Sequence, residues 1–483
     1  MIDMNINDMI VYPHFGTPVF VEPGASFRIE FTLSEKLPGN GWSAWVENDL
    51  KRWCCTISNV EAGENNIYLG LKSGYTAEVT LPGNVSPELC TLVIMHESGK
   101  ILRSAASVSV VPELDENFYI IHTTDTHLVA YDQDRGDGAL QGKTLGMMAR
   151  VATLAGARFF SHTGDVSLSH NESRAVSIRD FFIAPIMRMG RVPLVFAPGN
   201  HEYDYWVTPC PSLASGLRAG EFSQEDCDRY FGMRSQIINM GSFLVAKHDF
   251  GGYWDFPELR AALTAKWNNQ PENITYRLVL QHTHDGATAL FHNQLPEEIY
   301  PYPDLMLKGH DHEWKSVGPC SEYPFQIISC GGGAKRMNGQ ELPPVVEPYW
   351  VWGDSAIFDF RIDRNKRWTC PSAENWSEET GRFQLIEDGR TGRERNKLRD
   401  SFLNDNTTGT ARENLCEITN NLDFNFYNGR VRFLMEQGRY RVTGGEILSQ
   451  YDYRNETGMH TAVLVKVSIP AMDATCVRIS GTG

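Results

Sequence analysis

The sequence predicts a multidomain protein in which a central layered α/β domain lies between two all-β domains. Its 483 residues exceed the roughly 100 to 200 residues of one typical domain and predict about three. Hydrophobic residues make up 41% and charged residues 22%, so there is enough apolar material for more than one core. Strand-like patterns at both ends, and strands alternating with helices in the middle, set the class of each part.

The first predicted domain covers residues 1–112. Short β-rich runs, such as residues 26–32 and 90–95, alternate here with turn signals that include Pro-Gly dipeptides at residues 23 and 82. This pattern predicts an N-terminal β-sandwich that resembles immunoglobulin or fibronectin domains.

The second predicted domain covers residues 113–365, where apolar strands alternate with helical stretches. This alternation is typical of a layered α/β domain. The predicted helices are residues 144–155, 173–187 and 257–268. The predicted strands are residues 118–122, 158–162, 192–197, 243–246, 276–281, 304–308, 325–329 and 356–360.

The last part, residues 366–483, begins with a polar, irregular stretch that reaches about residue 410. β-patterned runs then return, for example at residues 429–434 and 461–467. We therefore expect an irregular linker followed by a C-terminal β-sandwich domain.

Five predicted strands of the central domain each end at a polar motif. Because α/β sheets place their sites outside the carboxyl ends of strands, we expect these motifs to meet at one edge. Their ligand atoms are oxygen and nitrogen without thiolate, which suits manganese, iron, zinc or cobalt. Glycines before three of the motifs permit close backbone approach. The motifs are Asp125-Thr126-His127, Gly164-Asp165, Gly199-Asn200-His201-Glu202, His282 and Gly309-His310-Asp311-His312.

In this order the motifs resemble the calcineurin-like metallophosphoesterases, whose pattern is DxH, GD, GNH(D/E), a lone histidine after a strand, and GHxH. The resemblance covers about residues 118 to 320 and implies two divalent or mixed-valence transition-metal ions. It assigns His201 as the catalytic residue, an acid or a phosphate-binding histidine beside the metals. It implies one metal on Asp125, His127, Asp165 and His312, and a second on Asp165, Asn200, His282 and His310, with Asp165 as the bridge.

Some histidines have alternative interpretations. His284 lies two residues after His282, and both point to the same face if the strand continues. His282 is nearer to the strand end and occupies the family's position, so we prefer it. Histidines that match no ligand position, namely His122, His162, His170 and His248, are predicted to be structural or to support the ligands.

Two positions separate this chain from the purple acid phosphatases of the same superfamily. Those proteins have a glycine where this chain has His127, and a tyrosine ligand where it has Leu168. The DxH form resembles the phosphodiesterase branch instead.

The resemblance implies hydrolysis of phosphodiesters, phosphomonoesters or both, by attack of a metal-bridging hydroxide on phosphorus. A net charge of -16 and a pI near 5.4 disfavour nucleic acid as the partner and leave a small phosphorylated substrate. The alternatives are a nuclease of the same fold and a metal-binding scaffold without catalysis.

The N-terminus has no basic region followed by an apolar one, and no later stretch approaches about 18 apolar residues. We therefore expect no membrane partner and a cytoplasmic location, or a secreted or periplasmic one if a leader has been removed.

Overall fold

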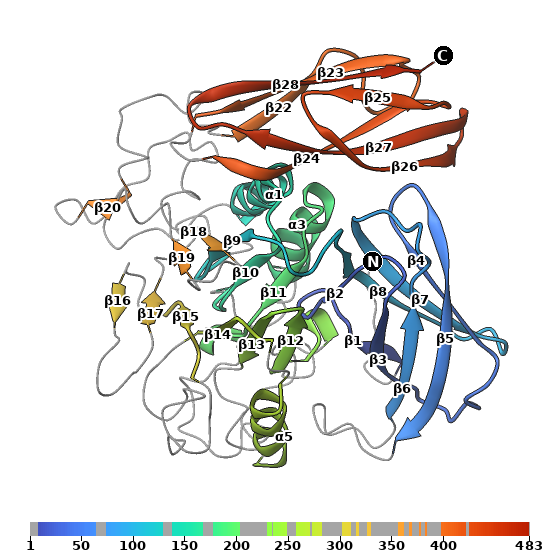
Figure 1. The fold of residues 1–483 in the computed structure, drawn as a ribbon. Helices are drawn as coiled ribbons and strands as arrows, with labels where there is room; N and C mark the ends of the chain where they lie inside the picture. The colour runs from blue at the N-terminus through green and yellow to red at the C-terminus, as the bar shows by residue number, and fades with distance from the viewer. Residues whose placement is uncertain are drawn as a thin grey trace.

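The structure is a computed structural model in which strands dominate and helices are few (Figure 1). No helix of the described residues is long and apolar enough to cross a membrane. The structure describes residues 8–63, 74–128, 138–167, 177–202, 229–233, 235–248, 257–270, 273–282, 302–310, 315–317, 326–329, 356–361, 367–369, 376–377, 382–383, 398–421 and 425–482.

The N-terminal strands, blue in Figure 1, form one continuous sheet with the order β1-β3-β6-β5-β4-β7-β8-β2. Strand β5 joins its two halves, because its first residues pair with β4 and its later residues with β6. Phe31 of β3 and Val46 of β4 lie in one buried cluster. The strands are β1 (Met9–Tyr12), β2 (Val19–Val21), β3 (Ser26–Thr32), β4 (Trp42–Glu47), β5 (Arg52–Gly63), β6 (Gly74–Thr80), β7 (Leu89–His96) and β8 (Ile101–Val110).

The central part contains two sheets, with the orders β11-β10-β9-β18-β19 and β12-β13-β14-β15-β17-β16. Strands β9, β10 and β11 run parallel, as do β13, β14, β15 and β17. The bounds in the first sheet are β9 (Phe118–Thr123), β10 (Phe160–His162), β11 (Leu194–Phe196), β18 (Ala356–Arg361) and β19 (Arg367–Thr369). Those in the second are β12 (Gln236–Met240), β13 (Phe243–His248), β14 (Tyr276–Gln281), β15 (Leu305–Lys308), β16 (Lys315–Val317) and β17 (Gln326–Ser329).

Apolar side chains of the two central sheets share one buried cluster, to which Ile120 of β9 and Leu280 of β14 belong. Helices α1 (Gly138–Ala155) and α3 (Ala184–Met189) contribute to the cluster on the other side of β9, and α5 (Pro257–Asn268) packs against the second sheet. This packing fixes the carboxyl ends of the parallel strands.

Strand β14 and helix α5 have the predicted bounds, whereas other elements differ. The helix predicted over residues 173–187 is described from Ser177 as a π-helix that ends at Ile183, followed by α3. Pro185 lies where the π-helix passes into α3, and because proline has no backbone N–H it cannot donate to the preceding turn. The prediction missed β12, β16 and β19, which are short strands that pair antiparallel with a neighbour.

The C-terminal strands, red in Figure 1, form a four-stranded sheet β22-β23-β28-β25 and a three-stranded sheet β24-β27-β26. Ile418 of the first and Val463 of the second share a buried cluster. The bounds are β22 (Leu398–Phe402), β23 (Glu413–Asn420), β24 (Phe426–Glu436), β25 (Tyr440–Thr443), β26 (Glu446–Asn455), β27 (Gly458–Ile469) and β28 (Asp473–Gly481), with the two-residue strands β20 (Trp376–Ser377) and β21 (Arg382–Phe383) before them.

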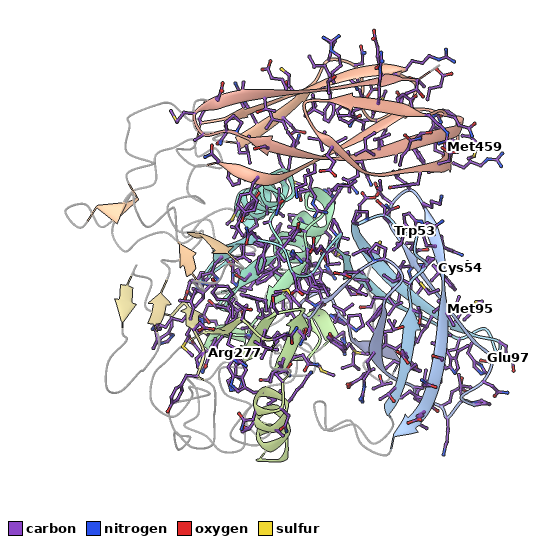
Figure 2. All side chains as sticks on the ribbon, in the orientation of Figure 1. Trp53, Cys54, Met95, Glu97, Arg277 and Met459 are labelled. Atoms are coloured by element: carbon purple, nitrogen blue, oxygen red, sulfur yellow. The ribbon has the colours of Figure 1, made fainter. Side chains whose placement is uncertain are left out.

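The two flanking parts touch each other and the central part. The ring of Trp53, labelled in Figure 2, lies edge-on to Tyr451 at 5.2 Å between centroids. Tyr119 of β9 contacts Phe426 of β24 at 5.5 Å. These contacts join the three parts of the chain.

The sheets described above confirm that both flanking parts are rich in strands, as predicted. Their sandwich class and the domain boundaries stay predictions.

Candidate metal centre

The predicted polar motifs follow β9, β10, β11, β14 and β15, at the carboxyl ends of parallel strands. The loops after β9 and β10 continue to pair beyond the strands. The N–H of Asp125 donates to the Gly164 carbonyl and that of His127 to the Asp165 carbonyl, each at 3.0 Å. These bonds hold the first two motifs side by side.

Four of the predicted ligands have left-handed backbones: Asp125 (φ 51°), His127 (φ 47°), Asp165 (φ 57°) and His310 (φ 72°). This region is uncommon for residues other than glycine and costs free energy that the surrounding structure must supply. Such conformations cluster at functional sites, and here they aim carboxylates and imidazoles toward one point.

Asp165 lies at the centre of a first group that also contains His127 and His201, with the ligand atoms within 4.8 Å of one another. Its Oδ2 is 3.7 Å from Nε2 of His127 and 3.8 Å from Nε2 of His201. Asp125 Oδ1 lies 3.6 Å from the same His127 nitrogen. The His201 side chain is 25% exposed, whereas that of His127 is 1% exposed, so His201 is on the open side.

A second group contains Asp165 again, together with His282 and His310. Asp165 Oδ2 lies 3.2 Å from Nε2 of His282. Asn200 belongs to this group as well, because its Oδ1 is 3.0 Å from His282 Nε2 and 3.2 Å from His310 Nδ1. Asp165 is therefore common to both groups.

The hydrogen bonds of His282 show that a cation fits between these atoms. Nδ1 of His282 lies 2.6 Å from the carbonyl of Thr163, which can only accept, so Nδ1 carries the proton. In the neutral ring, Nε2 presents its lone pair to two oxygens, those of Asp165 and Asn200. A positive charge is then needed between these atoms, either the second proton of the charged ring or a metal ion, and a metal-ligand histidine whose other nitrogen donates to a backbone carbonyl is the usual arrangement.

The charges of the cluster support the same conclusion. Burial disfavours the charged imidazolium of His282, but Asp165 and Asp125 raise its pKa to about 9. Burial likewise raises the pKa of Asp165, but His282 lowers it to about 2. The buried carboxylates thus attract a cation into the cluster.

Glycines allow the loops to approach. A Cβ at Gly309 would lie 1.9 Å from Oγ1 of Thr124 and 2.2 Å from Oδ2 of Asp125. A Cβ at Gly199 would lie 2.4 Å from Oδ1 of Asp165. Any larger residue at either position would push a predicted ligand away.

Glu202 completes the Gly199-Asn200-His201-Glu202 motif, and its place there left a structural and a catalytic role equally plausible. The structure shows a structural tie between two motifs. Its buried carboxylate accepts hydrogen bonds from the N–H groups of Gly199 (2.6 Å), Asp165 (2.9 Å) and Val166 (2.8 Å). Burial and Asp165 raise its pKa to about 7, while the three N–H donors oppose that rise.

The histidines predicted to be structural have such contacts. His122 Nδ1 lies 2.9 Å from Ser161 Oγ, and His248 Nδ1 lies 2.8 Å from Ser235 Oγ. Burial lowers the pKa of His122 to about 4, and those of His162 and His248 to about 3, so all three are neutral.

The structure brings together Asp125, His127, Asp165, Asn200, His201, His282 and His310. The predicted ligand His312, the alternative His284, and His170 and Leu168 lie outside the described residues.

A buried cluster of imidazoles and carboxylates at the ends of parallel strands is the type of site that metal-dependent hydrolases use. Residues 118–314 match the family model of calcineurin-like phosphoesterases. Metal-dependent hydrolysis of phosphoesters is the general activity that this match supports. No curated protein sequence matches the chain.

Among solved structures, the chain is similar to the purple acid phosphatase PPD1 from yellow lupin (Lupinus luteus). The two are 14% identical, the match covers 73% of this chain and 70% of that chain, and the TM-score is 0.36. A putative glycoside hydrolase from Bacteroides vulgatus is 10% identical over 96% of this chain and 99% of that chain, with a TM-score of 0.20.

Proposed function

We propose that this protein is a binuclear metal-dependent phosphoesterase that hydrolyses phosphodiesters, phosphomonoesters or both on small molecules. The observation that carries the proposal is the position of Asp165, whose Oδ2 faces His127 and His201 on one side and His282 on the other. One carboxylate shared by two ligand groups is what a pair of metals requires. The catalytic domain would be a layered α/β domain between two β-sandwiches.

In this proposal one metal is held by the side chains that follow β9 and β10, with His312 completing the set. The second is held by those that follow β11, β14 and β15, and Asp165 bridges the two. Two such ions would lower the pKa of a water, orient the phosphate and neutralise its charge. Manganese, iron, zinc and cobalt all accept this donor set.

The ligands themselves are held by the chain. Thr163 fixes the proton of His282 on Nδ1, so that Nε2 is free to act as a ligand at every pH at which the ring is neutral. The N–H of His310 donates to Asp125 Oδ2 at 2.9 Å, and this bond sets the distance between the loops after β9 and β15.

His201 is placed to handle the leaving group. Its backbone N–H donates to Asp165 Oδ1 at 2.9 Å, and its ring lies edge-on to His127 at 5.0 Å. The partly exposed ring can therefore reach a substrate on the open side. There it can donate a proton to the leaving alkoxide or a hydrogen bond to a phosphate oxygen.

A comparison of aryl phosphate monoesters and diesters tests the reaction class and its preference. The metal-reconstituted protein is expected to turn over at least one of them, and the DxH form of the first motif favours the diester. Metal content should reach two ions per chain. A content below one ion, or cleavage of DNA or RNA without turnover of either aryl ester, would contradict the proposal.

A further inference from the structure

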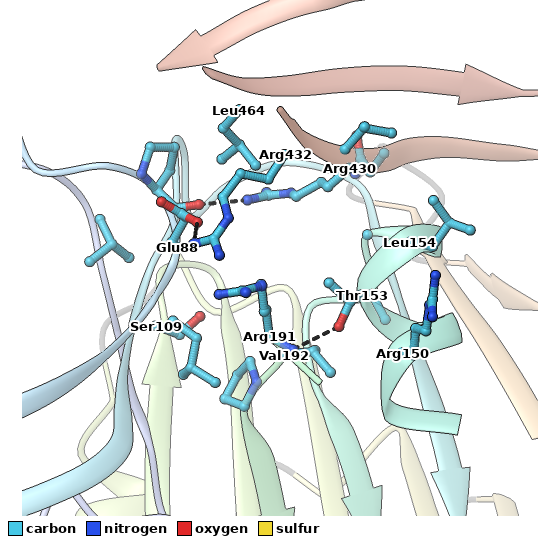
Figure 3. A pocket seen from close by; sticks show the side chains of 18 of the residues that line it. Glu88, Ser109, Arg150, Thr153, Leu154, Arg191, Val192, Arg430, Arg432 and Leu464 are labelled. Atoms are coloured by element: carbon cyan, nitrogen blue, oxygen red, sulfur yellow. Dashed lines mark hydrogen bonds and ion pairs between the residues drawn. The ribbon is translucent and has the colours of Figure 1, made fainter. Parts of the chain in front are cut away.

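A cavity lies at the amino ends of β9, β10 and β11, opposite the strand ends that carry the metal ligands, and all three parts of the chain line it (Figure 3). Its volume is 590 Å³, within the range of small-molecule sites. Leu50 comes from the N-terminal part, Leu154 and Val192 from the central part, and Leu464 from the C-terminal part. None of the predicted metal ligands lines it.

The charged lining of this cavity is basic, although the whole chain has a net charge of -16. Six guanidinium groups face four carboxylates, which leaves two positive charges in excess. The arginines are Arg150, Arg158, Arg188, Arg191, Arg430 and Arg432, and the acids are Asp49, Glu88, Glu116 and Asp400.

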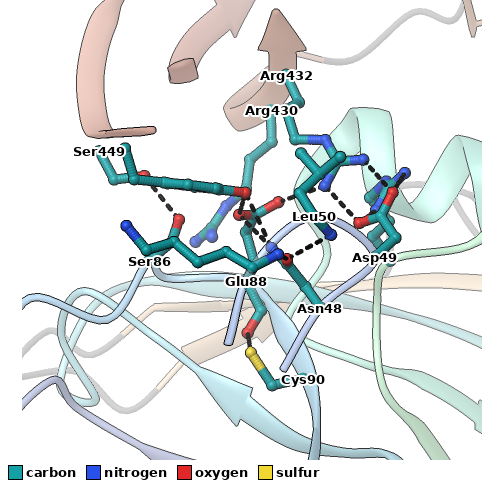
Figure 4. Close-up of polar contacts among 12 residues, drawn as sticks. Asn48, Asp49, Leu50, Ser86, Glu88, Cys90, Arg430, Arg432 and Ser449 are labelled. Carbon is teal, nitrogen blue, oxygen red and sulfur yellow. Dashed lines mark hydrogen bonds and ion pairs between the residues drawn. The ribbon is translucent and has the colours of Figure 1, made fainter. Parts of the chain in front are cut away.

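Three of the four acids form ion pairs with arginines of the same lining. Asp49 binds Arg432 at 2.7 Å and Arg191 at 2.9 Å, and Arg432 also reaches Glu88 at 3.2 Å (Figure 4). Asp400 binds Arg150 at 2.7 Å. These pairs neutralise three of the four acids of the lining, and Arg188 and Arg430 form no ion pair with a described carboxylate.

Two further arginines of the lining, Arg158 and Arg430, lie outside these pairs. Arg158 is only 5% exposed, and its Nη2 donates to Glu116 at 3.0 Å. Its Nη1 is buried and has no hydrogen-bond partner among the described residues. Arg430 donates to the Pro87 carbonyl at 2.9 Å and forms no ion pair with a described carboxylate.

The charge of Arg430 also acts on Arg158. Burial lowers the pKa of Arg158 to about 10, and Arg430 lowers it further against the opposing effect of Glu116. A buried N–H without an acceptor is unfavourable, so an acceptor that reached Nη1 of Arg158 would be bound favourably.

We propose that this cavity is a ligand site for a small organic oxyanion, a phosphonate, phosphate or carboxylate, whose anionic oxygens lie between Arg158 and Arg430. Guanidinium groups bind planar or tetrahedral oxyanions through paired N–H donors. The leucine and valine side chains of the lining would cover an apolar portion of the ligand. Because the ligand would contact three parts of the chain at once, its binding stabilises their association.

Calorimetric titration of the metal-loaded full chain with phenylphosphonate and, separately, with benzoate tests this site. We expect one of them to bind away from the metal centre and to raise the melting temperature. Benzyl alcohol, which lacks the charge, should not bind. The two anions distinguish a phosphate-type ligand from a carboxylate.

Arg430→Gln and Arg158→Gln should each weaken this binding about tenfold or more, since each removes a charged hydrogen bond. Arg430→Gln should leave aryl phosphate turnover unchanged. The matched control is Arg179→Gln, an arginine of the central part that does not line the cavity and whose side chain, 43% exposed, pairs with Asp180. If Arg158→Gln fails to fold, the anion affinity of Arg430→Gln alone tests the site.

The metal centre could also bind phenylphosphonate, and Asn200→Ala separates the two sites. Cavity binding should persist in Asn200→Ala and be lost in Arg430→Gln. The reverse result, or no binding of either anion by a folded and active protein, would overturn the cavity site without affecting the proposed phosphoesterase activity.

Discussion

His201 differs from the other histidines of the cluster because its ring is partly open to solvent while its backbone is fixed by Asp165. It is held in place without being enclosed, as a group that exchanges a proton with a substrate must be. Its neighbours His127 and His282 are buried and are suited to hold metals instead.

His201→Ala should therefore lower kcat by about 100- to 10,000-fold, the usual contribution of a positioned acid. The metal content should stay at the wild-type value, because the ligand atoms of the proposed metal sites remain. Aryl ester kinetics and metal analysis on the same sample check both parts. A variant that loses its metals along with its activity would show that His201 is a ligand.

Glu202 offers a second test at the scale of one residue, because its carboxylate is the shared acceptor for three N–H groups. Glu202→Gln replaces one of the acceptor oxygens by a donor and should cost about 1 to 3 kcal/mol in the free energy of unfolding. Metal affinity should fall about 10- to 100-fold, as for other residues that position ligands.

Urea denaturation and metal titration measure these two effects, with the exposed Glu446→Gln as the control. Equal metal affinity in Glu202→Gln and wild type would show that the Glu202 clamp does not position Asp165.

At the scale of elements, the predicted strands that carry motifs all exist, and β14 was predicted to the residue. Apolar runs such as the one within residues 276–281 indicate buried strands because a strand of a covered sheet is apolar on both faces. The same principle fails for β12 and β16, which are short edge strands. Their pairing is decided by neighbours far away in the chain.

The residues of the candidate site could also be predicted from the sequence, because they directly follow strands that the sequence predicts. The backbone N–H groups that Glu202 binds and the carbonyl of Thr163 did not follow, because a backbone group has no signature in the sequence. Those contacts depend on how two loops meet.

A substitution at Gly309 tests whether the loops after β9 and β15 must approach closely for metal binding. Gly309→Ala would place a Cβ against Thr124 and Asp125, so the loops must move apart. We expect metal affinity to fall at least about tenfold, as when a group that orients ligands is lost. Gly83→Ala is the matched control, because nothing lies within 4 Å of its Cβ. Unchanged metal binding in Gly309→Ala would mean that the loops tolerate the separation.

At the scale of the whole molecule, Asp49 of the N-terminal part joins Arg191 of the central part to Arg432 of the C-terminal part. This three-way contact could not be predicted, because the three residues are far apart in sequence and each is an ordinary surface type. Burial raises the pKa of Asp49, but Arg432 and Arg191 hold it well below its ordinary value of 3.8.

The stabilising effect of this carboxylate is complete above pH 3.8, the ordinary pKa, and declines as the pH falls toward the lower folded-state value. Asp49→Asn should therefore lower the free energy of unfolding by roughly 1 kcal/mol at pH 7, a value kept small because the Asp49 side chain is 47% exposed. The difference from wild type should narrow steadily below pH 3.8.

Urea midpoints from pH 7 to pH 2 measure this effect, with the exposed Glu35→Gln as the control. A difference that stays constant over the whole range would show that Asp49 acts through packing and not through its charge.

The left-handed backbones of Asp125, His127, Asp165 and His310 affect how mutagenesis of this centre has to be designed. Alanine removes a ligand but also places a poorly suited residue in a left-handed conformation, so an alanine scan would combine two losses in one number. Asparagine tolerates that conformation and has nearly the shape of aspartate. Asp125→Asn and Asp165→Asn are therefore the substitutions that separate the charge of these side chains from the geometry of their loops.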